Sequence, residues 1–84
     1  MPEISRFYGM VIKMYFIQAE HAPPHFHVIY GEYTGAIEIA NGMVLDGDLP
    51  AKSVAMVQEW LQSHRVALME IWKTQSFRKL PPLV

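Results

Sequence analysis

Three of the four histidines in this 84-residue chain lie close together, at positions 21, 25 and 27. Pro23 and Pro24 separate His21 from the other two. Each proline ring fixes its own φ and biases the preceding residue toward extended geometry, so the turn is stiff. Side chains alternate along a strand, which places His25 and His27 on one face. We therefore expect His21, His25 and His27 to converge beside the Pro-Pro turn.

Three imidazoles in one place suit a divalent metal. Neutral imidazole is a common zinc ligand, and catalytic zinc often has three protein ligands and one open position. One interpretation of the pattern is a metal site made by His21, His25 and His27, for a divalent metal such as zinc. Glu20 and Glu32 are the candidate outer-shell carboxylates, and either could serve as a general base in a hydrolase.

A structural role is the main alternative for these histidines. Imidazoles can hydrogen-bond to carbonyl groups around a turn and stack on rings such as Tyr15, Phe26 or Tyr30, which satisfies them without a ligand. Acid–base catalysis without a metal is a third interpretation. The sequence has no glycine-rich phosphate loop, so nucleoside triphosphate chemistry is not supported. Whether the chain is an enzyme is left open at this point.

Length and composition indicate one small globular domain over residues 1–84. The chain is 51% apolar and 18% charged, with a formal net charge of −1, which disfavours a nucleic-acid binder that acts through bulk charge. It has no cysteine, and its start does not resemble a signal peptide, so we expect a cytoplasmic protein. Its apolar runs are too short for a membrane span.

The first half of the chain has the period-two alternation of an antiparallel sheet, expected over residues 3–46. Asn41-Gly42 is a strong hairpin signal within it. The strands are expected at residues 2–8, 10–17, 25–30, 33–40 and 43–45.

After Asp48 the apolar residues recur at helical spacing. We expect helices near 50–63 and 65–77, interrupted at Ser63-His64-Arg65, and an extended segment at 80–84. The predicted fold class is α+β: an antiparallel β-meander of four to five strands followed by a C-terminal helical hairpin packed on one face. The expected core consists of Ile12, Met14, Phe16, Val28, Ile37, Ile39, Val57, Leu61, Leu68 and Trp72.

Several short motifs resemble one family of small bacterial proteins. They are Arg6-Phe7-Tyr8-Gly9, Met14-Tyr15-Phe16, Glu20-His21-Ala22-Pro23-Pro24-His25-Phe26-His27, Tyr30-Gly31-Glu32-Tyr33, Glu59-Trp60 and His64-Arg65. The family is catalogued as "domain of unknown function 4160". The resemblance implies a bacterial, cytoplasmic, stand-alone domain and implies no activity. It also implies a gene paired with another small gene, as in a toxin–antitoxin pair. The chain departs from the family pattern at 17–19 and 66–67.

Three functional hypotheses stay open. The first is an interaction or regulatory module with a protein partner or a second copy of itself, since a net charge near zero opposes self-association little. The second is a histidine-ligated metalloprotein. The third is a weak nucleic-acid binder that uses Lys73, Arg78 and Lys79, although one nearby aromatic, Phe77, makes a weak case.

Overall fold

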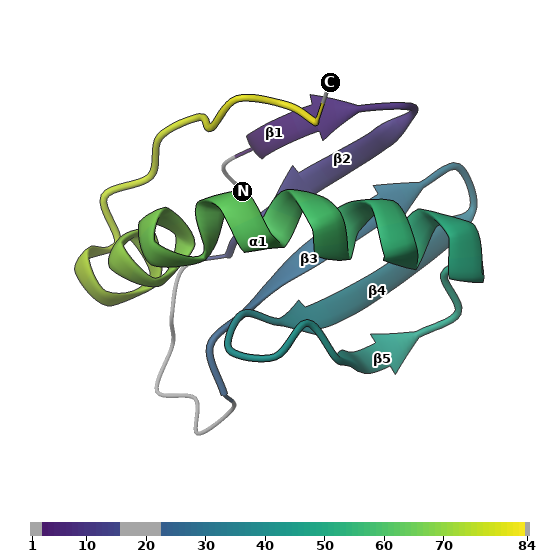
Figure 1. Ribbon diagram of the computed structural model, residues 1–84, viewed down its shortest axis with the longest axis horizontal. Helices are drawn as coiled ribbons and strands as arrows, with labels where there is room; N and C mark the ends of the chain where they lie inside the picture. Colours follow the sequence, from purple (N-terminus) through teal and green to yellow (C-terminus); the bar gives the residue numbers. More distant parts are fainter. Residues whose placement is uncertain (1–2, 16–22, 84) are drawn as a thin grey trace.

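The described residues form a five-stranded antiparallel sheet and one helix (Figure 1). The structure, a computed structural model, describes residues 3–15 and 23–83. The strands lie in sequence order across the sheet, from β1 to β5, and each neighbouring pair is antiparallel. Their bounds are β1 Glu3–Phe7, β2 Met10–Lys13, β3 His25–Tyr30, β4 Tyr33–Glu38 and β5 Val44–Gly47, and the helix α1 is Ala51–Thr74. The predicted α+β class and the predicted meander are confirmed.

The β4–β5 connection shows why Asn41-Gly42 predicts a hairpin. The side-chain oxygen of Asn41 accepts a hydrogen bond of 2.9 Å from the Met43 backbone N–H. Gly42 has a φ of +73°, which glycine adopts without the steric cost that a side chain brings. The N–H of Glu38 then donates to the Met43 carbonyl at 2.9 Å, and β5 returns beside β4.

The predicted helical hairpin is wrong, because α1 is a single helix of 24 residues. Ser63, His64 and Arg65 continue it. Serine and histidine are only mildly unfavourable in a helix interior, and no proline or glycine occurs within α1. The buried positions also form one continuous stripe through this point, with Leu61 before it and Leu68 after it.

The core lies between α1 and one face of the sheet (Figure 1). Trp60 is 1% exposed, and its ring centroid lies 5.6 Å from that of Phe7 and 5.9 Å from that of Phe26. The expected core residues that are fully buried are Ile12, Met14, Val28, Ile37, Ile39, Val57, Leu61 and Leu68. Phe16 lies outside the described residues. Trp72 is only half-buried at the margin of the core, so the large central ring is Trp60 instead.

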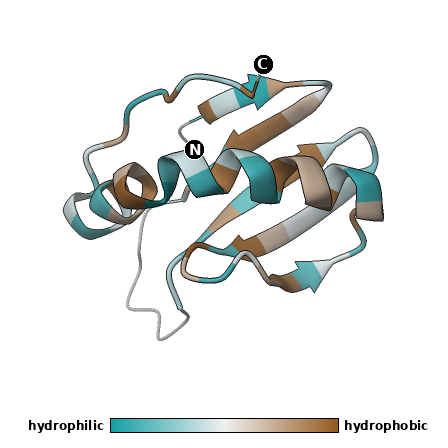
Figure 2. Cartoon of the chain, in the orientation of Figure 1, coloured by the Kyte–Doolittle hydropathy of each residue, from teal (hydrophilic) through white to brown (hydrophobic). Residues whose placement is uncertain are grey.

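The sheet face turned away from α1 is called the open face below. Ile12 and Val28 are paired and buried under α1, so the next pair along, Lys13 and His27, points to the opposite side. By the same register the open face includes Arg6, Val11, Ile29, Ala36 and Asp46. Figure 2 shows that hydrophobic and hydrophilic residues are interspersed in both the strands and α1.

The segment after α1 returns to the edge of β1. Gln75 ends the helix in a left-handed conformation, with its N–H bonded to the Ile71 carbonyl at 2.8 Å. The Leu80 N–H then donates to the Ile4 carbonyl at 2.7 Å, and the Leu80 side chain is buried in the core. In the described part of the chain, no helix combines the length and apolar character that crossing a membrane requires.

Candidate functional site

His25 and His27 lie next to each other at the start of β3, as alternation predicts. Their ring centroids are 5.1 Å apart with planes at 72°. The Nδ1 of His25 lies 2.8 Å from the Pro23 carbonyl oxygen. A carbonyl can only accept, so Nδ1 carries the proton and the lone pair of a neutral His25 is on Nε2. The rigid Pro-Pro turn thus sets the tautomer and the orientation of this imidazole.

Two more rings extend the pair into a row. The Tyr15 ring centroid lies 4.3 Å from that of His27, with the planes at 80°. On the other side, the Trp72 centroid lies 5.2 Å from that of His25. The row Tyr15–His27–His25–Trp72 therefore connects the end of the sheet to the last turns of α1. The structural interpretation of the motif predicts a histidine stacked on Tyr15, and the contact found is edge-to-face.

The remaining predicted site residues are not gathered around this pair. His21 and Glu20 lie outside the described residues. Glu32 is in the turn between β3 and β4, at the opposite end of β3 from His25. The carboxylate nearest in register is Glu38, which pairs with His25 across β3 and β4. Within residues 3–15 and 23–83, no group of three or more histidine, cysteine, aspartate or glutamate side chains could hold a metal ion.

The edge of the sheet at β5 presents a run of exposed apolar side chains. Met43 is 61% exposed, Val44 40% and Leu45 43%. All four residues of β5 are exposed, and its register with β4 shifts between Ala36 and Ile37, which marks a bulge. The sequence contains a signal for this apolar edge. An apolar run directly after Asn41-Gly42 belongs to the last strand, and the last strand of a meander lies at the edge of the sheet.

The opposite edge of the sheet is covered by the C-terminal segment. The Leu80 N–H pairs with the Ile4 carbonyl of β1, and the Trp60 indole N–H donates to the Pro81 carbonyl at 2.8 Å. Figure 1 shows this segment passing along β1, while no described element lies beyond β5. The two edges of one sheet therefore differ in accessibility.

A pocket of about 440 Å³ lies at the N-terminal end of α1. It is lined by Tyr8, Tyr30, Pro50, Lys52, Ser53 and Met56. Sequence reasoning missed it, because its walls come from the β1–β2 turn, the end of β3 and the first helical turn. Ser53 is buried and its hydroxyl donates to the Pro50 carbonyl at 2.7 Å, so this hydroxyl is already paired within the first helical turn.

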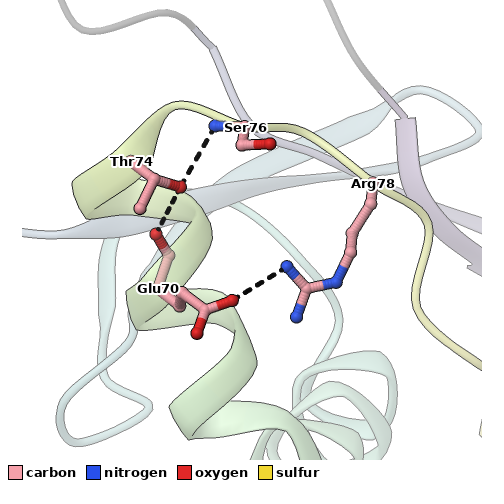
Figure 3. Close-up of polar contacts among 4 residues, drawn as sticks. All are labelled: Glu70, Thr74, Ser76 and Arg78. Atoms are coloured by element: carbon pink, nitrogen blue, oxygen red, sulfur yellow. Dashed lines mark hydrogen bonds and ion pairs between the residues drawn. The ribbon is translucent and has the colours of Figure 1, made fainter.

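Arg78 and Lys79 of the C-terminal segment each lie close to an acidic side chain. Arg78 lies 3.1 Å from Glu70, an ion pair that Figure 3 shows beside the end of α1. In the same view, the Thr74 hydroxyl donates to the Glu70 carbonyl at 2.9 Å and accepts from the Ser76 N–H at 3.2 Å. These contacts hold the segment against the helix end.

Comparison with known proteins gives one family match. The model of the family described as "Domain of unknown function (DUF4160)" matches residues 9–73, which is most of the chain. No curated protein and no solved structure matches the chain. The matched range contains all four histidines.

Proposed function

This chain belongs to the family described as "Domain of unknown function (DUF4160)", and we propose that it is a cytoplasmic protein-interaction module. Its contact surface is the edge of β5, where a partner protein adds an extended segment to the sheet. Strand addition of this kind gains affinity from main-chain hydrogen bonds and specificity from the side chains that flank them.

The exposed apolar run at β5 carries the proposal. An edge strand offers unpaired backbone groups, and natural proteins protect such edges with charge, bulges or covering segments. Here β1 is covered through Leu80, whereas β5 has Met43, Val44 and Leu45 exposed in succession. Contiguous exposed apolar patches on the surface of a small domain are typical of interaction sites.

The charges around β5 indicate the kind of partner. Glu38, Asp46 and Asp48 surround the edge, and no lysine or arginine occurs between residues 23 and 51. Two copies of β5 paired with each other would bring these acids together, which is unfavourable. The partner segment is therefore one that alternates basic and apolar residues.

The family resemblance suggests where such a partner is encoded. In a two-gene pair of the toxin–antitoxin kind, the partner is the product of the neighbouring gene. The gene-pair proposal says which protein the partner is, whereas the β5 proposal says which surface of this chain the partner contacts.

The experiment compares two lysine substitutions of exposed valines. Val44→Lys places a cation on the proposed edge, where it repels a basic segment. Val66→Lys is the matched control, because Val66 is 83% exposed on α1. Affinity-tagged wild type and both variants are recovered from the native cell, and co-purifying proteins are quantified by mass spectrometry.

We expect one protein to be retained equally by wild type and Val66→Lys, and at least about tenfold less by Val44→Lys, a difference of about 1.4 kcal/mol in binding free energy. Equal retention by all three, or no retained protein with wild type, contradicts the proposal. Melting curves of the two variants close to that of wild type establish that a loss is not caused by unfolding.

Metal binding is a second candidate, favoured by the orientation of His25. A carbonyl that fixes one imidazole nitrogen is typical of metal-ligating histidines. Here the Pro23 carbonyl holds Nδ1, so Nε2 is available, and the neighbouring His27 supplies a second imidazole. In this proposal His21 completes the set, and zinc is the metal.

Nucleic-acid binding is the least supported of the three hypotheses. Of its three cations, Arg78 is paired with Glu70, and Lys79 lies 3.8 Å from Glu3. Phosphate contacts would have to compete with these acids, and the chain as a whole is slightly acidic.

A further inference from the structure

The open face of the sheet has a charge gradient from one side to the other. On the β1–β2 side lie Arg6 and Lys13, with Lys79 beyond the edge. The acid on this side, Glu3, is 2.9 Å from Arg6, whose hydrogen bond lowers the pKa of Glu3. The side is therefore net basic.

The β4–β5 side of the same face is acidic. Asp46 pairs with Ala36 across β4 and β5, and Glu38 follows on β4. Asp48 comes directly after β5, and no lysine or arginine occurs between residues 23 and 51 of the sequence.

The middle of the open face is apolar. Val11 pairs with Ile29 on the central strands, and Ala36 lies on the next strand. Val11 and Ile29 are half-buried, although α1 lies on the other side of the sheet. A sheet with apolar residues on both faces normally has both faces covered.

We propose that a second copy of this chain covers the open face, related by a two-fold axis that runs roughly parallel to the strands, between β3 and β4. This axis places β2 of each copy over β5 of the other and β3 over β4, so Lys13 of each copy meets Asp46 of the other at both margins. A two-fold axis across the strands would instead place like charges over like. Interfaces of this kind are self-complementary, and two sheets pack face to face about 10 Å apart.

The same arrangement brings β3 and β4 of each copy to the axis. Because the axis lies between these strands, His25 and His27 of one copy lie over the β4 of the other. The second copy then adds two imidazoles to the two that the described residues of one chain supply. The dimer uses the sheet face and does not require strand pairing at the β5 edge. It therefore goes beyond the proposed function, and either proposal can be wrong while the other is right.

Lys13 and Asp46 are the best pair for a test. They lie in one row of paired residues, Lys13–His27–Ala36–Asp46, on four successive strands. Three strand spacings separate them, about 14 Å, which exceeds the screening length at physiological salt. They therefore interact little within a chain but meet between chains in the proposed dimer.

The test uses sedimentation velocity over a range of concentrations with Lys13→Glu, Asp46→Lys and the double variant. Wild type is expected to form a dimer of twice its 9.7 kDa mass, and each single variant to associate with roughly tenfold lower affinity or worse. A one-to-one mixture of the two single variants should restore the dimer. In that mixed dimer the two introduced charges face each other at one margin, and the native Lys13 and Asp46 face each other at the other. The double variant should restore association as well, because both of its margins pair the introduced charges.

Lys52→Glu is the matched control, since Lys52 is exposed at the start of α1, away from the open face. It should leave the dimer unchanged. A wild type that stays monomeric at all concentrations overturns the proposal. So does a mixture that remains monomeric, because the proposed axis requires position 13 of one copy to face position 46 of the other. If the single variants failed to associate because they unfold, the double variant should be destabilised further and should not regain association.

Discussion

The indole N–H of Trp60 donates a hydrogen bond of 2.8 Å to the backbone carbonyl oxygen of Pro81. One side chain at the centre of α1 thus holds the C-terminal segment in place, and Leu80 of that segment pairs with Ile4 on β1. Because this segment covers the β1 edge, β5 is the sheet edge left for a partner strand. The asymmetry of the two edges follows from this contact.

Trp60→Phe should destabilise the protein more than Trp72→Phe does. The first change removes the hydrogen bond to Pro81 and leaves a void among fully buried side chains, at a cost of about 2–3 kcal/mol. The second acts at the half-buried margin and should cost under about 1 kcal/mol. Urea unfolding of both variants measures the difference, and equal costs would mean that Trp60 is not the central ring.

Gly47→Ala should disrupt β5. Gly47 has a φ of +105°, and a Cβ there would overlap the Thr34 carbonyl oxygen and the Gly35 backbone. We expect a loss of about 2–4 kcal/mol in the free energy of unfolding. Gly31→Ala is the control, with a φ of +59° and no atom within 4 Å of the added Cβ. It should cost about 1 kcal/mol. Similar losses in chemical denaturation would contradict the geometry of the β4–β5 pair.

His64 should make the protein less stable in mild acid. Burial lowers the pKa of His64 below its ordinary value of 6.5, and its ring lies 5.0 Å from that of Trp60. The unfolded chain therefore binds the proton more tightly, so stability falls as the pH drops below about 6.5 and levels off below the folded pKa. His64→Gln should show a shallower decline between about pH 7.5 and 5. Parallel pH profiles of the two melting temperatures would show that this imidazole is not responsible.

Zinc should stabilise the protein at neutral pH if the histidines bind it. At a concentration about one hundredfold above Kd, the gain is about 2.7 kcal/mol, which raises the melting temperature by several degrees. The effect should vanish near about pH 5, where protonated imidazoles cannot ligate. It should also vanish in the His25→Gln/His27→Gln variant and persist in His64→Gln. If zinc does not change the melting temperature of the wild type, the metal proposal is wrong and the histidines have a structural role.

The sheet could be predicted from the sequence because its signals are local. Period-two alternation, Asn41-Gly42 and the change of period after Asp48 each report on a few neighbouring residues. The prediction of a helical hairpin is wrong for a related reason: Ser63-His64-Arg65 resembles a break when it is considered alone. In the structure His64 packs against Trp60, and the Arg65 Nε donates to the Ile39 carbonyl at 3.0 Å, so tertiary contacts support the helix there.

The candidate site was only partly predictable. Alternation placed His25 and His27 together, and their rings are adjacent. The role of Trp72 beside His25 depends on where a helix of 24 residues ends relative to the sheet, which spacing does not encode. The covering of the β1 edge depends likewise on the return of Leu80 to β1, a contact between residues far apart in the chain.

Amide hydrogen exchange of the isolated protein and of its complex with the co-purified partner tests whether the partner adds a strand at β5. If the partner adds a segment at β5, exchange at residues 44–47 should slow markedly in the complex, while exchange in β1 should stay unchanged. Protection confined to α1 or to β1, with β5 exchanging as in the isolated protein, would contradict the account.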